Sequence, residues 1–294
     1  MMFRFQFRRM IQSLGFKIAF SFMMGFTMVC LFKQLLDYRH TDISAIPDAN
    51  VLYCGFGFND FWTYFTIFFP FVIVLPFATS LITDAQCRVL APIWVRSSVP
   101  RYFVSKLAVS FAGGALVIGV PFLLNLILSN LIFPHNHNVM FGEYAMDNYY
   151  GMLTGSSQLY TSLRPGFMHL DLYLASPFLY NVLYLCILTA FAGLMSAVLM
   201  GLSFFLKKRK IILFFPFFIF WYLSRNITEF IFSSAVEDTS VIFRNFGFTD
   251  YLAPVTFGGQ IPYYLLILAV LFLAFIGIAL AYALRDPLKY IQEG

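Results

Sequence analysis

Long apolar runs alternate with short charged segments along this chain of 294 residues. A helix that crosses a lipid bilayer needs about 20 mostly apolar residues, and six runs reach that length. The predicted spans cover about residues 16–36, 61–82, 106–133, 176–206, 211–233 and 262–284. An even number of spans places both termini on the same side of the membrane. The pattern therefore predicts an all-α polytopic membrane protein, folded as one transmembrane domain over residues 1–294.

Composition and charge refine this prediction. With 60% hydrophobic and 11% charged residues, the chain has more apolar surface than a soluble domain can bury. Lysine and arginine in short loops stay in the cytoplasm and so set the orientation. Fourteen of the 19 lysines and arginines fall on one predicted side: Arg4, Arg8, Arg9, Lys17, Arg88, Arg96, Arg101, Lys106, Lys207, Lys208, Arg209, Lys210, Arg285 and Lys289. Both termini are therefore predicted to be cytoplasmic. Because the basic residues are divided among four membrane edges, nucleic acid is not expected as a partner.

Residues 1–15 combine aromatic and basic side chains. Read as a helix, they place Phe3 and Phe7 on one side and Arg4 and Arg8 on another, a pattern suited to a membrane surface. One interpretation is an amphipathic helix along the cytoplasmic face, with Arg4, Phe7 and Arg8 at the interface. The other is a basic flank that anchors the first span.

The predicted cytoplasmic segment 84–106 carries an unusual apolar face. Val89, Leu90, Ile93 and Trp94 recur at helical spacing, and Pro100 follows them before the third span. The pattern predicts one short amphipathic helix that ends before that span. Either lipid headgroups or a groove on a soluble partner would cover its apolar face.

The predicted external segments 134–175 and 234–260 are long and rich in aromatic residues. Length and composition of this kind argue against a simple link or disorder. Both segments are expected to form short interfacial helices over the outer side of the bundle.

Motifs for catalysis or nucleotide binding are absent from the sequence. It contains no GxxxxGK[ST] phosphate loop, no HExxH, no GxSxG and no glycine-rich dinucleotide turn, so no catalytic residue and no cofactor are predicted for this chain. The pair His135 and His137 does not have a specific zinc spacing, and no metal site is predicted. Cys30 lies in a span and Cys54 outside, which predicts packing cysteines and no disulfide.

A few polar residues fall within the predicted spans, where they are costly. Arg225 and Glu229 are four residues apart and share one helix face. Together with Asn125 they form a possible translocation path. The alternatives are that Arg225 and Glu229 extend to the outer interface and that Asn125, like Asn130 and Asn181, bonds between helices.

The loop before the third span has a recognisable pattern. Its residues are Asp84, Arg88, Arg96, Ser97, Pro100, Arg101, Tyr102 and Lys106, directly before an apolar run that contains glycines. This arrangement resembles the membrane subunit of a type-2 ATP-binding-cassette (ABC) exporter. The run PFLYNVLYLCILTAFAGL at 177–194 is similar to bacterial permeases of the same group.

The resemblance implies a partnership of several subunits. Two membrane subunits, either two copies or two related chains, would pair with two cytoplasmic ABC ATPase subunits, which bind ATP and Mg. The residues implied in coupling to the ATPase are Asp84, Arg88, Val89, Leu90, Ile93, Trp94, Arg96, Arg101 and Lys106. The cargo would be amphiphilic (a peptide, an antimicrobial or a lipid-like molecule) and would leave the cell across a bacterial plasma membrane.

Two other classes of function remain open at the level of sequence. One is a polytopic membrane enzyme, such as a protease or lipid transferase. The other is a sensor or immunity protein without turnover. Co-purification with an ATPase would distinguish the exporter interpretation from both of these classes.

Overall fold

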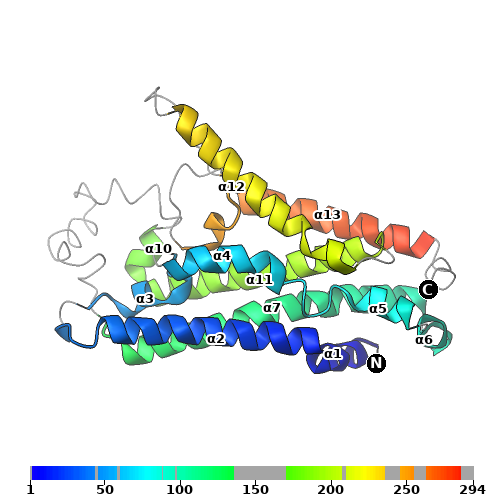
Figure 1. The fold of residues 1–294 in the computed structure, drawn as a ribbon, viewed down its shortest axis with the longest axis horizontal. Coiled ribbons are helices and arrows are strands. Elements are labelled where there is room, and N and C mark those ends of the chain that lie inside the picture. Colours follow the sequence, from blue (N-terminus) through cyan, green and yellow to red (C-terminus); the bar gives the residue numbers. More distant parts are fainter. Residues whose placement is uncertain are drawn as a thin grey trace.

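The computed structural model describes residues 2–43, 46–57, 60–87, 89–96, 98–135, 170–206, 210–235, 246–254 and 263–285. Within these ranges every regular element is a helix, so the all-α class is confirmed. Five helical stretches are long and apolar enough to cross a membrane: α2 (Leu14–Asp37), α7 (Val99–Ile132), α11 (Pro177–Ser203), Lys210–Ile227 with its helix α12 (Pro216–Ala235), and α13 (Tyr264–Arg285). They follow the long axis of the molecule, and α12 diverges at one end (Figure 1).

The predicted span 61–82 is not one continuous helix. Helix α4 (Asp60–Val72) ends shortly after Pro70, turns follow, and α5 (Ser80–Gln86) begins the next helix. Proline lacks the backbone N–H that a helix interior needs, and this span also contains Pro76. Irregular backbone at membrane depth is tolerated only when protein surrounds it, and Ile73 and Val74 in these turns are fully buried.

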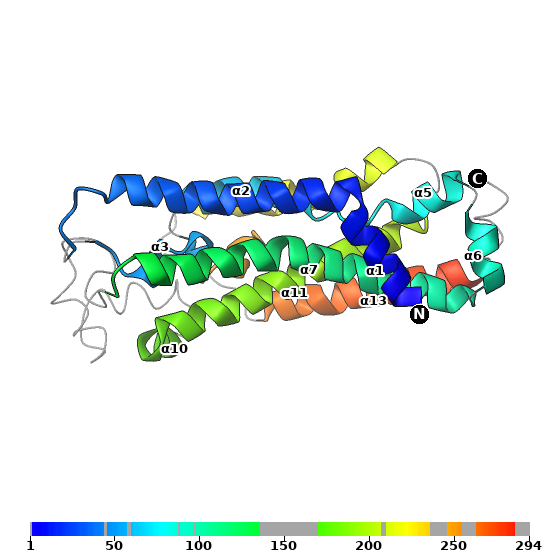
Figure 2. The same ribbon diagram turned by 90° about the horizontal axis from the view of Figure 1, so that it is seen from below.

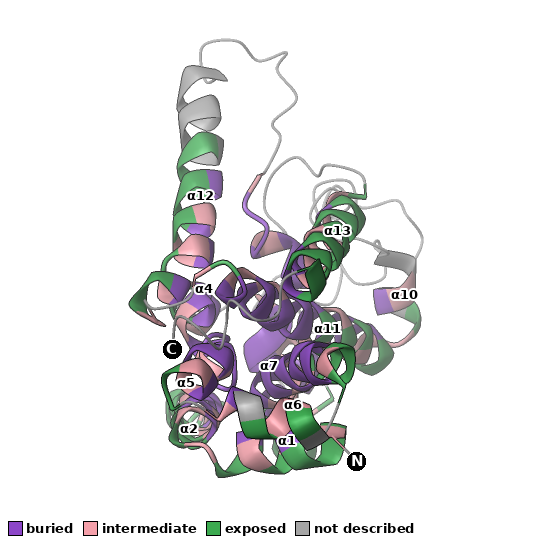
Figure 3. Ribbon diagram, turned by 90° about the vertical axis from the view of Figure 1, so that its right-hand side faces the viewer, coloured by how far each residue is buried: buried purple, intermediate pink, exposed green. Residues whose placement is uncertain are grey.

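Helices α7 and α11 form the centre of the molecule. Figure 3 shows both largely buried, whereas α12 and α13 have mostly exposed outer faces. Small residues permit the close approach: a Cβ added to Gly114 would lie 2.7 Å from the Ala192 carbonyl oxygen. The Ser110 hydroxyl donates a hydrogen bond to the Ser196 carbonyl oxygen at 2.9 Å across the same contact.

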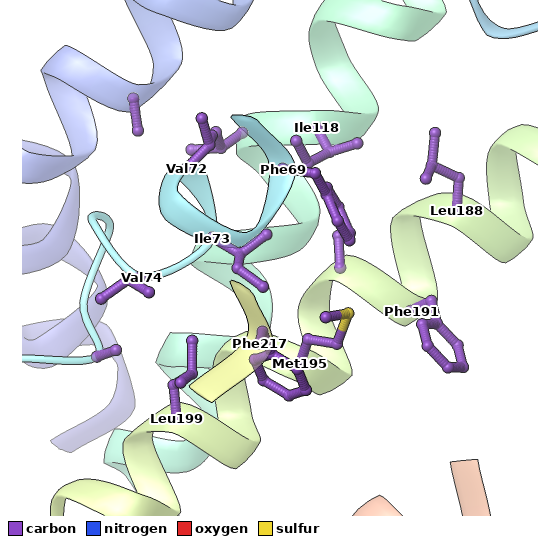
Figure 4. Packing of buried hydrophobic residues seen from close by; sticks show 14 of the residues in the cluster. Phe69, Val72, Ile73, Val74, Ile118, Leu188, Phe191, Met195, Leu199 and Phe217 are labelled. Atoms are coloured by element: carbon purple, nitrogen blue, oxygen red, sulfur yellow. The ribbon is translucent and has the colours of Figure 1, made fainter. Parts of the chain in front are cut away.

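We call α4, α5 and the turns between them (residues 60–86) the broken segment. One hydrophobic core joins this segment to three long helices. Figure 4 shows Phe69 and Ile73 beside Ile118 of α7, Met195 of α11 and Phe217 of α12. The turns between α4 and α5 are therefore held by packing on all sides.

The N-terminal residues form a separate helix, α1 (Met2–Gln12), which crosses α7 at an angle to α2 (Figure 2). The predicted N-terminal helix is confirmed. Ser13 ends it and caps α2 by accepting a hydrogen bond from the Phe16 amide at 3.2 Å. At Gly15 any side chain would collide with the Leu75 carbonyl, so this glycine lets α2 begin against the broken segment.

Three short α-helices and three short 3-10 helices complete the described chain: α3 (Ala49–Leu52), η2 (Cys54–Phe56), α6 (Leu90–Arg96), α10 (Leu170–Ala175), η3 (Lys210–Phe214) and η4 (Asp250–Leu252). Helices α3 and α10 lie at one end of the molecule, and α1, α5 and α6 lie at the other (Figure 1). Most of the predicted external segments, 136–169, 236–245 and 255–262, lies outside the described residues.

Candidate functional site

A buried group of charges joins α1, α5 and α7. Asp84 and Lys106 are both completely buried, and the lysine Nζ lies 2.7 Å from Asp84 Oδ2. Arg9 Nη1 lies 2.5 Å from the other carboxylate oxygen. The Tyr102 hydroxyl donates to Asp84 Oδ2 at 2.7 Å. We call these four residues the ionic cluster.

The surroundings of Lys106 explain how a buried ammonium group is tolerated. Its Nζ donates to the Ser80 hydroxyl at 2.9 Å and lies 4.4 Å from the centre of the Phe77 ring. A buried charge needs a counter-charge and further partners, because leaving water costs several kcal/mol for each ion. The cluster supplies both and therefore holds α5 and α7 together at this end of the molecule.

Helix α6 folds back onto α7 beside the ionic cluster. Leu90 is buried, and the Trp94 ring packs 6.3 Å from Tyr102 and 6.1 Å from Phe103, measured between ring centres. The predicted apolar face thus contacts this chain itself. The outward surface of α6 includes Val95, whose side chain is 88% exposed.

The predicted coupling residues therefore differ in their surroundings. Asp84 and Lys106 meet in the ionic cluster, Leu90 and Trp94 pack inward, and Arg101 is exposed. Val89 and Ile93 are half-buried. Arg88 and the side chain of Arg96 lie outside the described residues.

Sequence reasoning missed two members of the cluster. Arg9 counted only as a cytoplasmic basic residue, and Tyr102 was part of a pattern without a role of its own. The spacing between Asp84 and Lys106 indicated that both flank one loop, but nothing local connects Arg9 with them.

The N-terminal helix places Phe3 and Phe7 side by side, with their ring centres 5.8 Å apart. Arg4 and Arg8 are exposed, Phe7 is half-buried, and Phe3 is 47% exposed. Met10 is fully buried where α1 crosses α7. The aromatic side of α1 is thus shared between the protein and its surroundings.

At the opposite end, residues 48–56 insert between the long helices; we call them the inserted segment. Each of three long helices contributes one side-chain amide that donates a hydrogen bond to a backbone carbonyl oxygen in this region. Gln34 of α2 donates to the Leu52 carbonyl oxygen at 2.5 Å, and Asn181 of α11 to that of Asn50 at 2.9 Å. Asn125 of α7 donates to the Thr27 carbonyl oxygen and accepts from the Cys54 amide, each at 3.0 Å.

These bonds bear on the predicted translocation path. Both polar groups of Asn125 are used between elements, as the helix-bonding alternative predicted. Arg225 is exposed and lies 6.0 Å from the centre of the Trp221 ring. The side chain of Glu229 lies outside the described residues, so the Arg225–Glu229 pair stays a prediction.

Asn125→Leu should lower the free energy of unfolding by about 2 kcal/mol, because it leaves the buried Cys54 amide without its acceptor and removes the bond to the Thr27 carbonyl. Asn130→Leu, five residues further along α7, is the matched control. Among the described residues, Asn130 donates to the Leu126 carbonyl of its own helix and not to another helix, so the prediction was wrong for this residue. Its loss should cost under about 1 kcal/mol. Unfolding in mixed detergent micelles measures both, and hydrogen exchange should accelerate in residues 48–56 of the first variant only. Equal losses in the two variants would contradict the role of the Asn125 hydrogen bonds in holding the inserted segment against α2.

No protein-family model, curated protein or solved structure matches this chain. The class of protein therefore follows from the fold itself: several long apolar helices indicate a multi-pass helical membrane protein. Any narrower function has to be argued from the ionic cluster, α6 and the inserted segment.

Proposed function

We propose that this chain is the transmembrane subunit of an ABC transporter that exports an amphiphilic substrate, with ATP hydrolysed by a separate cytoplasmic subunit. The observation that carries the proposal is the ionic cluster. It connects α1, α5 and α7 next to a short helix, α6, that lies crosswise at the end of the molecule (Figures 1 and 2). The resemblance of the loop 84–106 to type-2 exporters supports the same interpretation.

In this proposal the broken segment α4–α5 is the second of six membrane crossings, and both termini are cytoplasmic. The positive charges of α1 and the α5–α7 region then face the cytoplasm. The partner ATPase contacts the exposed side of α6, around Val95, rather than the buried Leu90 and the inward-packed, partly buried Trp94.

Movement of α6 would reach the membrane helices through rigid contacts. Trp94 packs on α7, and the buried Asp84–Lys106 pair prevents α5 and α7 from separating. Separation would break this buried ion pair and leave each charge without its partner, which costs several kcal/mol. ATP-driven closure of the partner would therefore move α5, α6 and α7 as one body. A second membrane subunit would complete the path for the cargo.

The first test is purification of the tagged chain from its native membrane in mild detergent. We expect an ATPase subunit in equal amount. Val95→Asp should reduce the co-purified ATPase roughly tenfold, equivalent to about 1.4 kcal/mol of binding free energy. The matched control is Ile43→Asp, an exposed apolar position (73% exposed) that follows α2 at the end of the molecule opposite α6, and it should retain the partner.

Two results would contradict the proposal. A chain that purifies alone, without nucleotide dependence, favours a membrane enzyme or a sensor. An ATPase that remains fully bound to the Val95→Asp variant removes α6 from the contact.

A further inference from the structure

Two of the four cysteines are buried together. Cys30 in α2 and Cys54 in η2 have no exposed surface, whereas Cys87 and Cys186 are exposed. The sequence predicted no disulfide, because Cys30 falls inside a span and Cys54 outside one. The inserted segment overturns the premise of that prediction, since it carries Cys54 into the bundle beside α2.

Hydrogen bonds on both sides of Cys30 fasten this contact. Thr27, Cys30 and Gln34 follow one another at three- and four-residue spacing and share one face of α2. On one side, the Asn125 amide bridges the Thr27 carbonyl and the Cys54 N–H. On the other side, Gln34 bonds to the Leu52 carbonyl. Cys30 therefore faces residues 52–54, and its buried thiol is a direct neighbour of the buried Cys54 thiol.

We propose that Cys30 and Cys54 form a disulfide, which links the first span to the inserted segment. The proposal rests on the orientation given under the proposed function, in which residues 48–56 lie on the side away from the cytoplasm. It does not depend on an ATPase partner. Disulfides persist in such oxidising compartments and not in the cytosol.

The oxidant is a soluble disulfide, either of a small thiol or of a thiol oxidoreductase. One cysteine thiolate attacks it, forms a mixed disulfide and releases the first thiol. The second cysteine attacks the protein sulfur of that mixed disulfide and releases the second thiol. The two cysteines are oxidised, the soluble disulfide is reduced to two thiols, and the two cysteine protons end on those thiols.

Burial indicates when this reaction occurs. Neither thiol is exposed once the inserted segment is in place, so a soluble oxidant reaches them before it packs. The neighbouring Cys30 thiol, and then burial, also raise the pKa of the Cys54 thiol well above its ordinary value, which disfavours the reactive thiolate in the packed state. The bond would therefore form during insertion and folding.

The test counts free thiols by intact mass. Membranes from aerobically grown cells are dissolved in SDS with N-ethylmaleimide and without reductant, so that burial does not protect any cysteine. We expect two labels, on Cys87 and Cys186, and four after reduction. Unreduced digests should contain the peptides of Cys30 and Cys54 joined together.

Variants assign the bond. Cys54→Ser should carry three labels without reductant, because Cys30 is released, whereas Cys87→Ser should carry one and keep the joined peptides. Four labels on the unreduced wild type, also after treatment of the membranes with oxidised glutathione, would overturn the proposal. Four labels together with a co-purified ATPase would overturn the disulfide and leave the transporter proposal standing. Two labels without an ATPase would support the disulfide and contradict the transporter proposal.

Discussion

Asp84→Asn should lower the free energy of unfolding by about 3–5 kcal/mol, because it removes the counter-charge of a fully buried lysine. Asp84 and Lys106 are both completely buried, with charged atoms 2.7 Å apart. Asparagine has nearly the same size and can still accept the Tyr102 hydroxyl, so the substitution isolates the effect of charge. Lys106 would lose its counter-charge and keep the Ser80 hydroxyl, two aromatic rings and the like-charged Arg9 as neighbours. Unfolding by SDS titration in mixed micelles, followed by circular dichroism, measures the loss.

Two further variants make this prediction specific. Adding Lys106→Met to Asp84→Asn should recover most of the loss, since no fully buried charge then remains unpaired. Arg9→Gln is the control: its side chain is 38% exposed, and pairs that water reaches contribute about 1 kcal/mol or less. A single Asp84→Asn variant as stable as the wild type would refute the role of the ionic cluster.

Gly114→Val should destabilise the protein by about 3 kcal/mol, at the upper end of what overpacking costs, because backbone has to move. A Cβ at this position would lie 2.7 Å from both the Ala192 carbonyl oxygen and the Ser196 Cβ. Relief requires α7 and α11 to separate, which would also stretch the hydrogen bond from Ser110 to Ser196. The expected observation is a lower midpoint in the same SDS titration and loss of a single symmetric peak in size-exclusion chromatography.

Gly25→Val is the matched control for this effect. Gly25 lies within α2, and an added Cβ there would meet no atom within 4 Å. Its stability should change by no more than about 0.5 kcal/mol. Similar damage in both variants would assign the loss to valine in a helix rather than to the contact between α7 and α11.

The ends of several spans were predicted well from the sequence alone. The predicted 16–36 became Leu14–Asp37, and 262–284 became Tyr264–Arg285. The third span begins earlier than predicted, at Val99, because a proline is compatible with the first helical turn. Lys106 consequently lies inside this helix, and its charge is neutralised there by Asp84 rather than displayed at a loop.

Other features were not visible in hydropathy. The turns around Ile73 and Val74 are as apolar as the helices beside them, so an apolar run could not reveal the break between α4 and α5. The same limit applied to α6, whose apolar face was predicted correctly. Whether this chain or a partner covers Leu90 and Trp94 depends on where α7 lies.

The sequence by itself determined the helical class and the membrane character, and it predicts the side on which the basic residues gather. Each of these follows from local composition, because the bilayer imposes a length on every span and resists the passage of charge. Only the tertiary structure brought Arg9 to Asp84, Asn125 to Cys54, and Cys30 to Cys54. Such pairs join residues far apart in the chain, and burial makes them necessary, because a charge or amide away from water needs a partner that only the packed fold can provide.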